Sequence, residues 1–211
     1  MAVETEIIVV QEIIGAIGLM AFALSGFMEA RRHMMDVGGI FAVGFVTAFG
    51  GGTVRDLLLD NRPWFWVSHD EYVWLVLFMA GVALTPTIRL LSSAASAKCI
   101  MVADALGTGL FSVLGTYRAL SMSVPLFPAS IIGVATGVSG GVLRDVLCNN
   151  IPAVLERDRF YAVCPFAGCW TFIALHELDV AHSLSVLAGL LATVALRLLA
   201  VRFNLRLPGR Y

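Results

Sequence analysis

Charged residues are scarce in this sequence. Asp, Glu, Lys and Arg make up 14% of its 211 residues, whereas 59% of the residues are hydrophobic. Soluble domains carry about 25% charged residues, so water cannot be the solvent for most of this surface. The formal net charge of −1 gives no reason to expect nucleic acid as a partner, because nucleic-acid binding depends on basic patches. The composition therefore indicates a membrane protein.

Catalytic and metal-binding patterns are also absent. The four cysteines lie in or at the ends of apolar stretches and form no CxxC pair, which favours packing residues over a disulfide or a metal site. No Ser-His-Asp, HExxH, Walker-type or dinucleotide-binding pattern stands in a suitable context. We therefore expect neither an enzyme nor a metal centre nor an organic cofactor.

One structural unit occurs twice in the chain. The stretch from Thr47 to Pro63 returns 89 residues later as the stretch from Thr136 to Pro152, with Gly-Gly and Arg-Asp at matching positions. The same offset, without a gap, aligns residues of roughly 15–91 with residues of roughly 104–180. A period this long in a chain this apolar is typical of the duplicated halves of membrane transport proteins.

Seven segments are apolar enough to cross a bilayer, whose core of about 30 Å needs about 20 residues per helix. They cover approximately residues 7–30, 37–59, 72–91, 99–117, 125–148, 160–176 and 183–201. The alternation of barrel strands is absent, so helices are the spanning elements. We predict one all-α transmembrane domain over residues 1–211, with repeat 1 at about 7–91, repeat 2 at about 99–180 and a seventh helix at about 183–201.

Arg and Lys predict the orientation. Seven spans would place ten of the fourteen Lys and Arg residues on the side of the C-terminus, including Arg202, Arg206 and Arg210, and leave the loops near Arg62 and Arg118 on the other side. Basic loops stay in the cytoplasm, so we expect the N-terminus outside and the C-terminus in the cytoplasm, in a bacterial or archaeal inner membrane. An odd number of spans per repeat would then make the repeats inverted.

Glycine triplets lie in the middle of the second span and, as Ser-Gly-Gly, of the fifth. Each glycine costs a helix about 1 kcal/mol relative to alanine, so the pattern indicates either close helix packing or a kink or break; because it is repeated, we favour the break. Unwound backbone at membrane depth survives only where it is buried or lines water, and its carbonyl and hydroxyl oxygens could bind a cation. The candidate pore residues are Thr47, Gly50, Gly51, Gly52, Thr53, Thr136, Ser139, Gly140 and Gly141.

Charged residues inside the spans form a second candidate group. An ionised side chain in a span costs at least about 2.5–3.5 kcal/mol, so Arg55, Asp56, Arg144 and Asp145 should face the bundle interior or water. Sequence neighbours point about 100° apart on a helix, which predicts that each arginine pairs elsewhere rather than with the adjacent aspartate. The acids at matching depth are Glu12 for the first arginine and Asp104 for the second.

The whole chain resembles the prokaryotic branch of the trimeric intracellular cation (TRIC) channel family, a domain also catalogued as glycine-transporter-like. Its doubled Gly-Gly-x-x-Arg-Asp motif and three-plus-three-plus-one plan carry the resemblance. The resemblance implies a homotrimer with one pore in each protomer, kinked at the glycine motifs, that passes monovalent cations, chiefly K⁺. The Lys-Glu-Val motif of the animal members is absent here, so their phosphoinositide and Ca²⁺ regulation is not implied.

Three functions remain open at this point. A cation channel is favoured, a secondary carrier for glycine or another small solute comes second, and a non-conducting scaffold third. The expected partners are further copies of this chain and membrane lipids, including bound lipid. The expected bound species are permeant monovalent cations rather than a cofactor.

Overall fold

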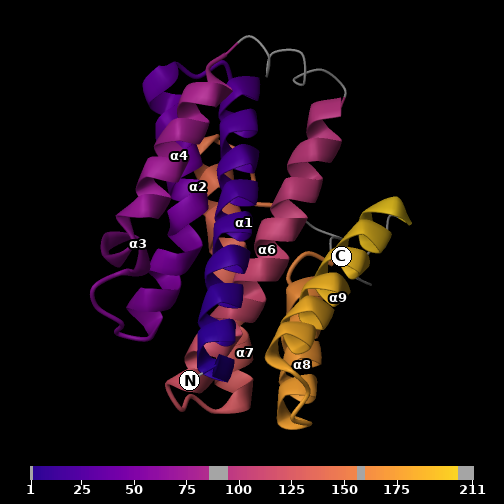
Figure 1. The fold of residues 1–211 in the computed structure, drawn as a ribbon. Helices are drawn as coiled ribbons and strands as arrows, with labels where there is room; N and C mark the ends of the chain where they lie inside the picture. Colours follow the sequence, from indigo (N-terminus) through magenta and orange to yellow (C-terminus); the bar gives the residue numbers. More distant parts are fainter. Residues whose placement is uncertain (1, 86–94, 156–159, 204–211) are drawn as a thin grey trace.

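The computed structural model describes residues 2–85, 95–155 and 160–203, with the side chains of 12–85, 98–155 and 160–203. Every element of regular secondary structure in these parts is a helix (Figure 1). The helices are α1 (Ala2–Arg32), α2 (Val37–Leu58), α3 (Phe65–Ser68), α4 (Asp70–Ala83), α6 (Ala95–Ser121), α7 (Leu126–Leu147), α8 (Val163–Glu177) and α9 (His182–Arg202).

Five of these helices are long and apolar enough to cross a membrane, namely α1, α2, α6, α7 and α9. The all-helical membrane class is therefore confirmed. Helices α4 and α8 coincide with the predicted third and sixth spans, but their 14 and 15 residues give only about 21–23 Å at 1.5 Å per residue. The end of the predicted third span, at 86–91, falls outside the described residues. The short helix α3 was not expected.

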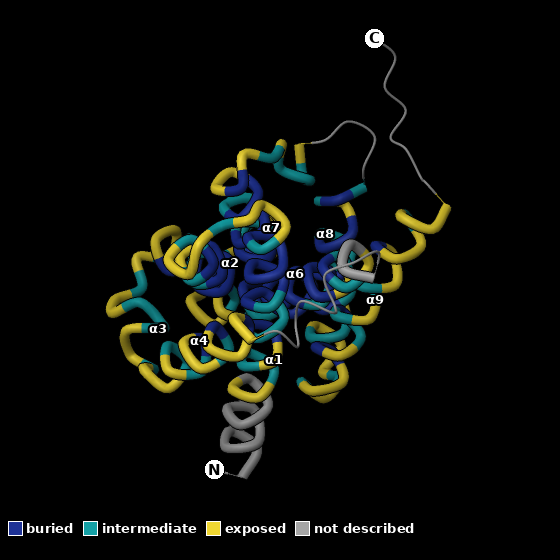
Figure 2. The backbone as a smooth tube through the Cα atoms, turned by 90° about the horizontal axis from the view of Figure 1, so that it is seen from above, coloured by how far each residue is buried: buried dark blue, intermediate teal, exposed yellow. Residues whose placement is uncertain are grey.

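Helix α6 forms the centre of the bundle. It lies among α1, α7, α8 and α9. In its most apolar stretch 72% is buried inside the protein, compared with 28% for the corresponding stretch of α9. Figure 2 shows α6 in the buried interior and α9 at the edge. Exposed leucines along α9, such as Leu184, Leu187 and Leu191, suit a helix that faces lipid or another subunit rather than water.

Contacts between the two halves are reciprocal. Where a residue of the first half meets one of the second, their counterparts 89 residues away meet as well. A Cβ atom at Gly18 would meet the ring of Phe111, and one at Gly107 would meet the ring of Phe22. These two rings stack with centroids 5.4 Å apart. A contact within each repeat also recurs, between Gly26 and Thr47 in the first and between Gly115 and Thr136 in the second. The sequence repeat is therefore also a repeat of contacts, with the Phe22–Phe111 stack between the two copies.

The glycine motifs do not interrupt their helices. Helix α2 continues through Gly50, Gly51 and Gly52, and α7 continues through Gly140 and Gly141. The expected unwound backbone is therefore not seen. Both helices end several residues beyond their motifs. Tertiary packing explains why the helices stay intact, because each motif packs against the opposite helix.

Candidate functional site

Helices α2 and α7 cross at the predicted pore motifs. A Cβ atom added at Gly51 would overlap the carbonyl oxygen of Thr136, and one added at Gly140 would overlap the carbonyl oxygen of Thr47. Both glycines are buried. These two positions need glycine because the backbone of one helix lies directly against the backbone of the other. This is the close helix packing that the sequence left open as the alternative to a break.

The other motif glycines face side chains rather than backbone. These side chains are Leu143 for Gly50, Phe65 for Gly52, and Tyr161 with Asp104 for Gly141. An added methyl group would overlap Leu143 or Phe65 and would make tight contacts with Tyr161 and Asp104, although a side chain can move more easily than a carbonyl. The motif therefore permits close approach on several faces of α2 and α7.

The predicted hydroxyl ligands bond to their own helices. The donor and acceptor pairs are Thr47 to Val43 O at 2.6 Å, Thr53 to Phe49 O at 2.9 Å, Thr136 to Ile132 O at 2.7 Å and Ser139 to Ala135 O at 2.5 Å. Such bonds satisfy a hydroxyl in an apolar interior. Each hydroxyl oxygen keeps acceptor capacity, but the predicted freed carbonyls are absent.

A buried charged network surrounds Asp104, which is 2% exposed. Its Oδ1 accepts from Nη1 of Arg144 at 2.8 Å, and its Oδ2 accepts from Nη2 of Arg197 at 2.5 Å and from the Tyr161 hydroxyl at 2.8 Å. The Arg197 guanidinium also lies 3.5 Å above the Tyr161 ring. The predicted pairing of Asp104 with Arg144 is confirmed, and α9 adds a second arginine to the same carboxylate.

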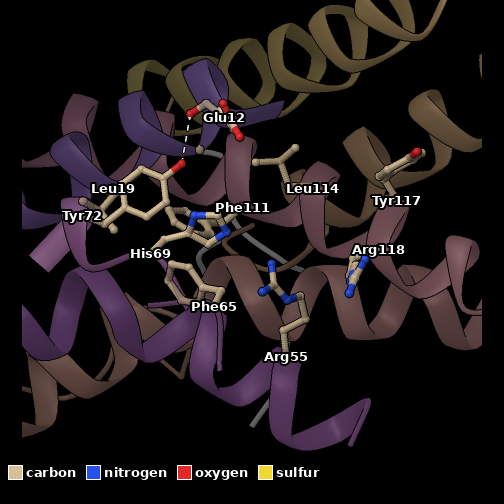
Figure 3. Close-up of a pocket in the computed structure, with 11 residues that line it drawn as sticks. Glu12, Leu19, Arg55, Phe65, His69, Tyr72, Phe111, Leu114, Tyr117 and Arg118 are labelled. Atoms are coloured by element: carbon tan, nitrogen blue, oxygen red, sulfur yellow. Dashed lines mark hydrogen bonds between the residues drawn. The ribbon is translucent and has the colours of Figure 1, made fainter. Parts of the chain in front are cut away.

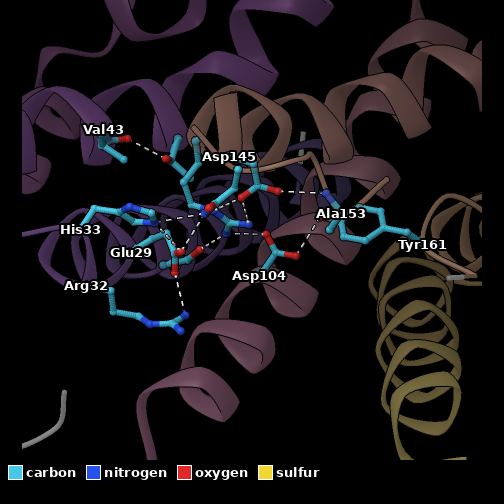
Figure 4. A network of polar contacts seen from close by, with 12 residues as sticks. Glu29, Arg32, His33, Val43, Asp104, Asp145, Ala153 and Tyr161 are labelled. Carbon is cyan, nitrogen blue, oxygen red and sulfur yellow. Dashed lines mark hydrogen bonds and ion pairs between the residues drawn. The ribbon is translucent and has the colours of Figure 1, made fainter. Parts of the chain in front are cut away.

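Arg144 extends the network to three further groups. Its Nε and Nη2 bind one oxygen of Asp145 at 2.9 and 2.8 Å, and its Nη1 also donates to Ser25 of α1. The other oxygen of Asp145 accepts from Ala153 N at 3.0 Å. Figure 4 shows Asp104, Asp145, Ala153 and Tyr161 close together in this region. We call Asp104, Arg144, Arg197, Tyr161, Asp145 and Ser25 the Asp104 network.

The first repeat contains the same neighbour pair. Arg55 binds Oδ1 of Asp56 through Nε at 2.8 Å and through Nη2 at 2.7 Å, and the fully buried Asp56 also accepts from Phe65 N at 2.8 Å. The prediction that neighbouring Arg and Asp cannot pair was therefore wrong in both repeats. The long arginine side chain bends back along the helix, and a buried carboxylate favours the nearest cation.

A cavity of about 360 Å³ opens beside Arg55, between α1, α4 and α6. Glu12 and Arg55 both line it, together with Tyr72, Leu114 and Arg118 (Figure 3). Glu12 is exposed, and among the residues with described side chains it forms no ion pair with Arg55. The two residues therefore share one space as predicted, but the expected pairing of Arg55 with Glu12 is not formed. We call this space the Arg55 cavity.

The Phe22–Phe111 stack separates the Arg55 cavity from the Asp104 network. Phe111 lines the cavity, while Ser25, one turn from Phe22 on α1, receives the hydrogen bond from Arg144. The two polar regions thus lie toward opposite ends of the antiparallel pair α1 and α6. Between them lie the aromatic stack and the crossing of α2 and α7.

Sequence reasoning missed several members of the polar clusters. Arg197 was counted only among the charges on the side of the C-terminus, although its place inside the predicted seventh span, 183–201, was a signal of burial. Tyr161 and Ser25 gave no signal of these contacts, because Tyr161 approaches Asp104 from the turn before α8 and Ser25 approaches Arg144 from α1. Glu29, 8% exposed, accepts from Asn150 at 3.1 Å, and this contact was likewise not predicted.

Comparison with known proteins identifies the family. The family model described as "Glycine transporter" matches residues 12–86 and again residues 101–177. A "UPF0126 membrane protein" of Vibrio cholerae is 35% identical over 93% of this chain and 81% of its own length. The "UPF0126 inner membrane protein YadS" of Escherichia coli is 34% identical over 91% and 92%. These relatives agree with an integral inner membrane protein.

Solved structures give the same answer. The TRIC trimeric intracellular cation channel orthologue from Rhodobacter sphaeroides matches with a TM-score of 0.84 and 34% identity, over 93% of this chain and 99% of that one. A second structure, described under conductance through TRIC cation channels, matches with a TM-score of 0.82 and 34% identity over 95% and 97%. These proteins are channels rather than enzymes, in agreement with the sequence. The chain therefore belongs to the TRIC family, whose repeated domain is the one that the glycine-transporter model describes.

Proposed function

We propose that this protein is a channel for monovalent cations, chiefly K⁺, with one pore in each protomer of a homotrimer. The observation that carries the proposal is similarity to TRIC cation channels over more than nine-tenths of both chains at 34% identity. The buried charges support it, because ionised groups inside membrane spans mark ion pathways.

The pore of this proposal passes along the interface of the two repeats, constricted where α2 and α7 cross at the glycine motifs. The contacts exchanged between positions 89 residues apart support an inverted repeat, with α4 and α8 as the third span of each copy and α9 as the seventh helix. Because Thr47 and Thr136 carbonyls abut the opposite glycines, conduction requires α2 and α7 to move apart at this point. Permeant cations and bound lipid, rather than a cofactor, are the proposed ligands.

Ion flux in sealed liposomes tests the function. Purified protein reconstituted with a K⁺ gradient is expected to dissipate that gradient without valinomycin when a protonophore carries the compensating charge, at a rate that does not saturate in the manner of a carrier. Protein-free liposomes are the control. Saturable counterflow of glycine without K⁺ flux would instead support the carrier that the family description suggests. Cross-linking and native mass measurement of the same preparation should give a trimer.

The proposed orientation places the N-terminus outside the cell. Arg31 and Arg32 end α1, Lys98 lies near the start of α6, and Arg202 ends α9, and Figure 1 draws the first two of these helix ends toward the same end of the bundle. Basic residues favour the cytoplasmic side. Arg206 and Arg210 fall outside the described residues.

Reporter fusions check this orientation. A phosphatase that is active only after export should be inactive when fused after Tyr211, whereas a fluorescent protein at the same position should be bright. Insertion of the phosphatase in the loop near Arg62 serves as the exported control. An active C-terminal phosphatase would reverse the proposed topology.

A further inference from the structure

The Arg55 cavity occupies the place in the first repeat that the Asp104 network occupies in the second. The offset of 89 residues relates Arg55 to Arg144, Asp56 to Asp145 and Tyr72 to Tyr161. Arg55 and Tyr72 both line the cavity. The two sites are therefore built from the same residue types, although one is filled and the other is open.

The two arginines are held in the same way. In each repeat, Nε and Nη2 bind a single oxygen of the following aspartate at 2.7–2.9 Å. In the second repeat, Nη1 of Arg144 is then free to bind the Asp104 carboxylate. In the first repeat, Nη1 of Arg55 has no hydrogen-bond acceptor among the residues whose side chains are described. The arginine Nη1 group therefore binds a carboxylate in the second repeat, whereas its equivalent in the first repeat binds no described residue.

The acceptors are missing because the sequence replaces them. The position equivalent to Asp104 is Gly15, and the position equivalent to Ser25 is Leu114. Both replacements line the cavity. A Cβ atom at Gly15 would lie 3.9 Å from the Tyr72 hydroxyl, and that hydroxyl makes only a 3.4 Å contact with the backbone oxygen of Glu12. The space left by the absent carboxylate is thus bordered by the two donors that would bind it.

The charge and size of the cavity suit a small anion. Its lining carries the guanidinium groups of Arg55 and Arg118 against the single carboxylate of Glu12, with His69 and the phenols of Tyr72 and Tyr117 as the other titratable groups. Within the described part of the chain, the Arg118 side chain donates only to an amide oxygen, that of Asn61, at 3.3 Å. About 360 Å³ falls within the range of roughly 300–1,000 Å³ typical of ligand pockets. Phe65 and Phe111 supply apolar walls.

We propose that the Arg55 cavity binds a small organic carboxylate, whose carboxylate group takes the place that the Asp104 side chain takes in the second repeat. Nη1 of Arg55 and the hydroxyl of Tyr72 donate to it, as Arg144 and Tyr161 donate to Asp104. Arg118 balances the negative charge of the ligand, and the apolar part of the ligand lies against the aromatic walls. Such a site is distinct from the crossing of α2 and α7.

Equilibrium binding of radiolabelled benzoate and acetate to the purified full-length protein tests the proposal, with chloride as the competing salt. We expect saturable binding of benzoate that excess acetate displaces and equal chloride does not. Gly15→Asp supplies the missing carboxylate from within and should abolish binding. Gly15→Asn, which adds a similar volume without a charge, is the matched variant and should weaken binding less. Tyr72→Phe removes one bond to a charged group and should weaken binding about tenfold.

Several results would overturn the site. These are no saturable binding of either carboxylate by the parent protein, equal displacement by chloride, or unchanged affinity in both Gly15→Asp and Tyr72→Phe. If Gly15→Asp fails to fold, Tyr72→Phe still decides, because the Tyr72 hydroxyl has no strong partner among the residues that the structure describes. The measurement involves no ion flux, so its failure leaves the proposed cation channel standing, and failure of the channel leaves the site standing.

Discussion

Replacing Asp104 with asparagine should strongly destabilise the protein. The carboxylate is the shared counter-charge of Arg144 and Arg197, and all three side chains are at least nine-tenths buried. Removing one partner of a buried ion pair costs about 3–5 kcal/mol, because the remaining charge stays buried without compensation. Thermal unfolding in detergent, followed by size-exclusion chromatography, should show a large loss of folded protein.

Two further variants separate charge from size. Asp60→Asn makes the same chemical change at an exposed turn where the backbone is left-handed (φ 48°), a conformation that asparagine tolerates, and should be neutral. Asp104→Asn combined with Arg197→Gln restores the charge balance, with Asp145 still paired to Arg144. The double variant should be more stable than Asp104→Asn alone. If it is not, the network is held together by shape rather than by charge.

Replacing Gly51 or Gly140 with alanine should also have a large effect, opposite in sign to the effect expected from helix propensity. Alanine favours a helix by about 1 kcal/mol over glycine. The added Cβ, however, would overlap a backbone carbonyl of the opposite helix, and such overpacking typically costs about 1–3 kcal/mol. We therefore expect each variant to unfold at lower temperature than the parent and its K⁺ flux in liposomes to fall.

Gly81→Ala is the matched control for this prediction. Gly81 lies within α4, and an added Cβ there would meet nothing within 4 Å. This variant should gain a little stability from helix propensity and keep the flux of the parent. If Gly51→Ala and Gly140→Ala behave like Gly81→Ala, the crossing of α2 and α7 is looser than its geometry indicates, and the constriction must be sought elsewhere along the repeat interface.

Some features could be read directly from local sequence. Apolar segments of about 20 residues identified the long helices, because burial in lipid requires a continuous apolar stretch with satisfied backbone bonds. The repeat identified Arg55 and Arg144 as equivalent residues. The expected depth of each residue in the membrane also paired Asp104 with Arg144, because residues a few turns from a helix end have a predictable height across the membrane.

Other features depend on contacts between distant parts of the chain, which the spacing of residues along the sequence does not reveal. Arg197 reaches Asp104 across 93 residues and Tyr161 across 57, and the rotation of each helix about its own axis decides such meetings. The neighbour pairs Arg55–Asp56 and Arg144–Asp145 form because both side chains are confined at a buried site. An ideal exposed helix would keep them apart.

The sequence by itself determined the membrane environment, the two-copy architecture and the positions of the intramembrane charges, because each follows from composition or from the offset of 89 residues. Only the tertiary structure decided how the glycine motifs and the charges are used. The motif glycines could have served a break or a close approach, and the proximity of the Thr47 and Thr136 carbonyls favours close approach. The repeated Arg-Asp pairs look alike in sequence, yet packing closes one around Asp104 and leaves the other open at Gly15, because Gly15 and Leu114 provide no side-chain acceptor where the second repeat has Asp104 and Ser25.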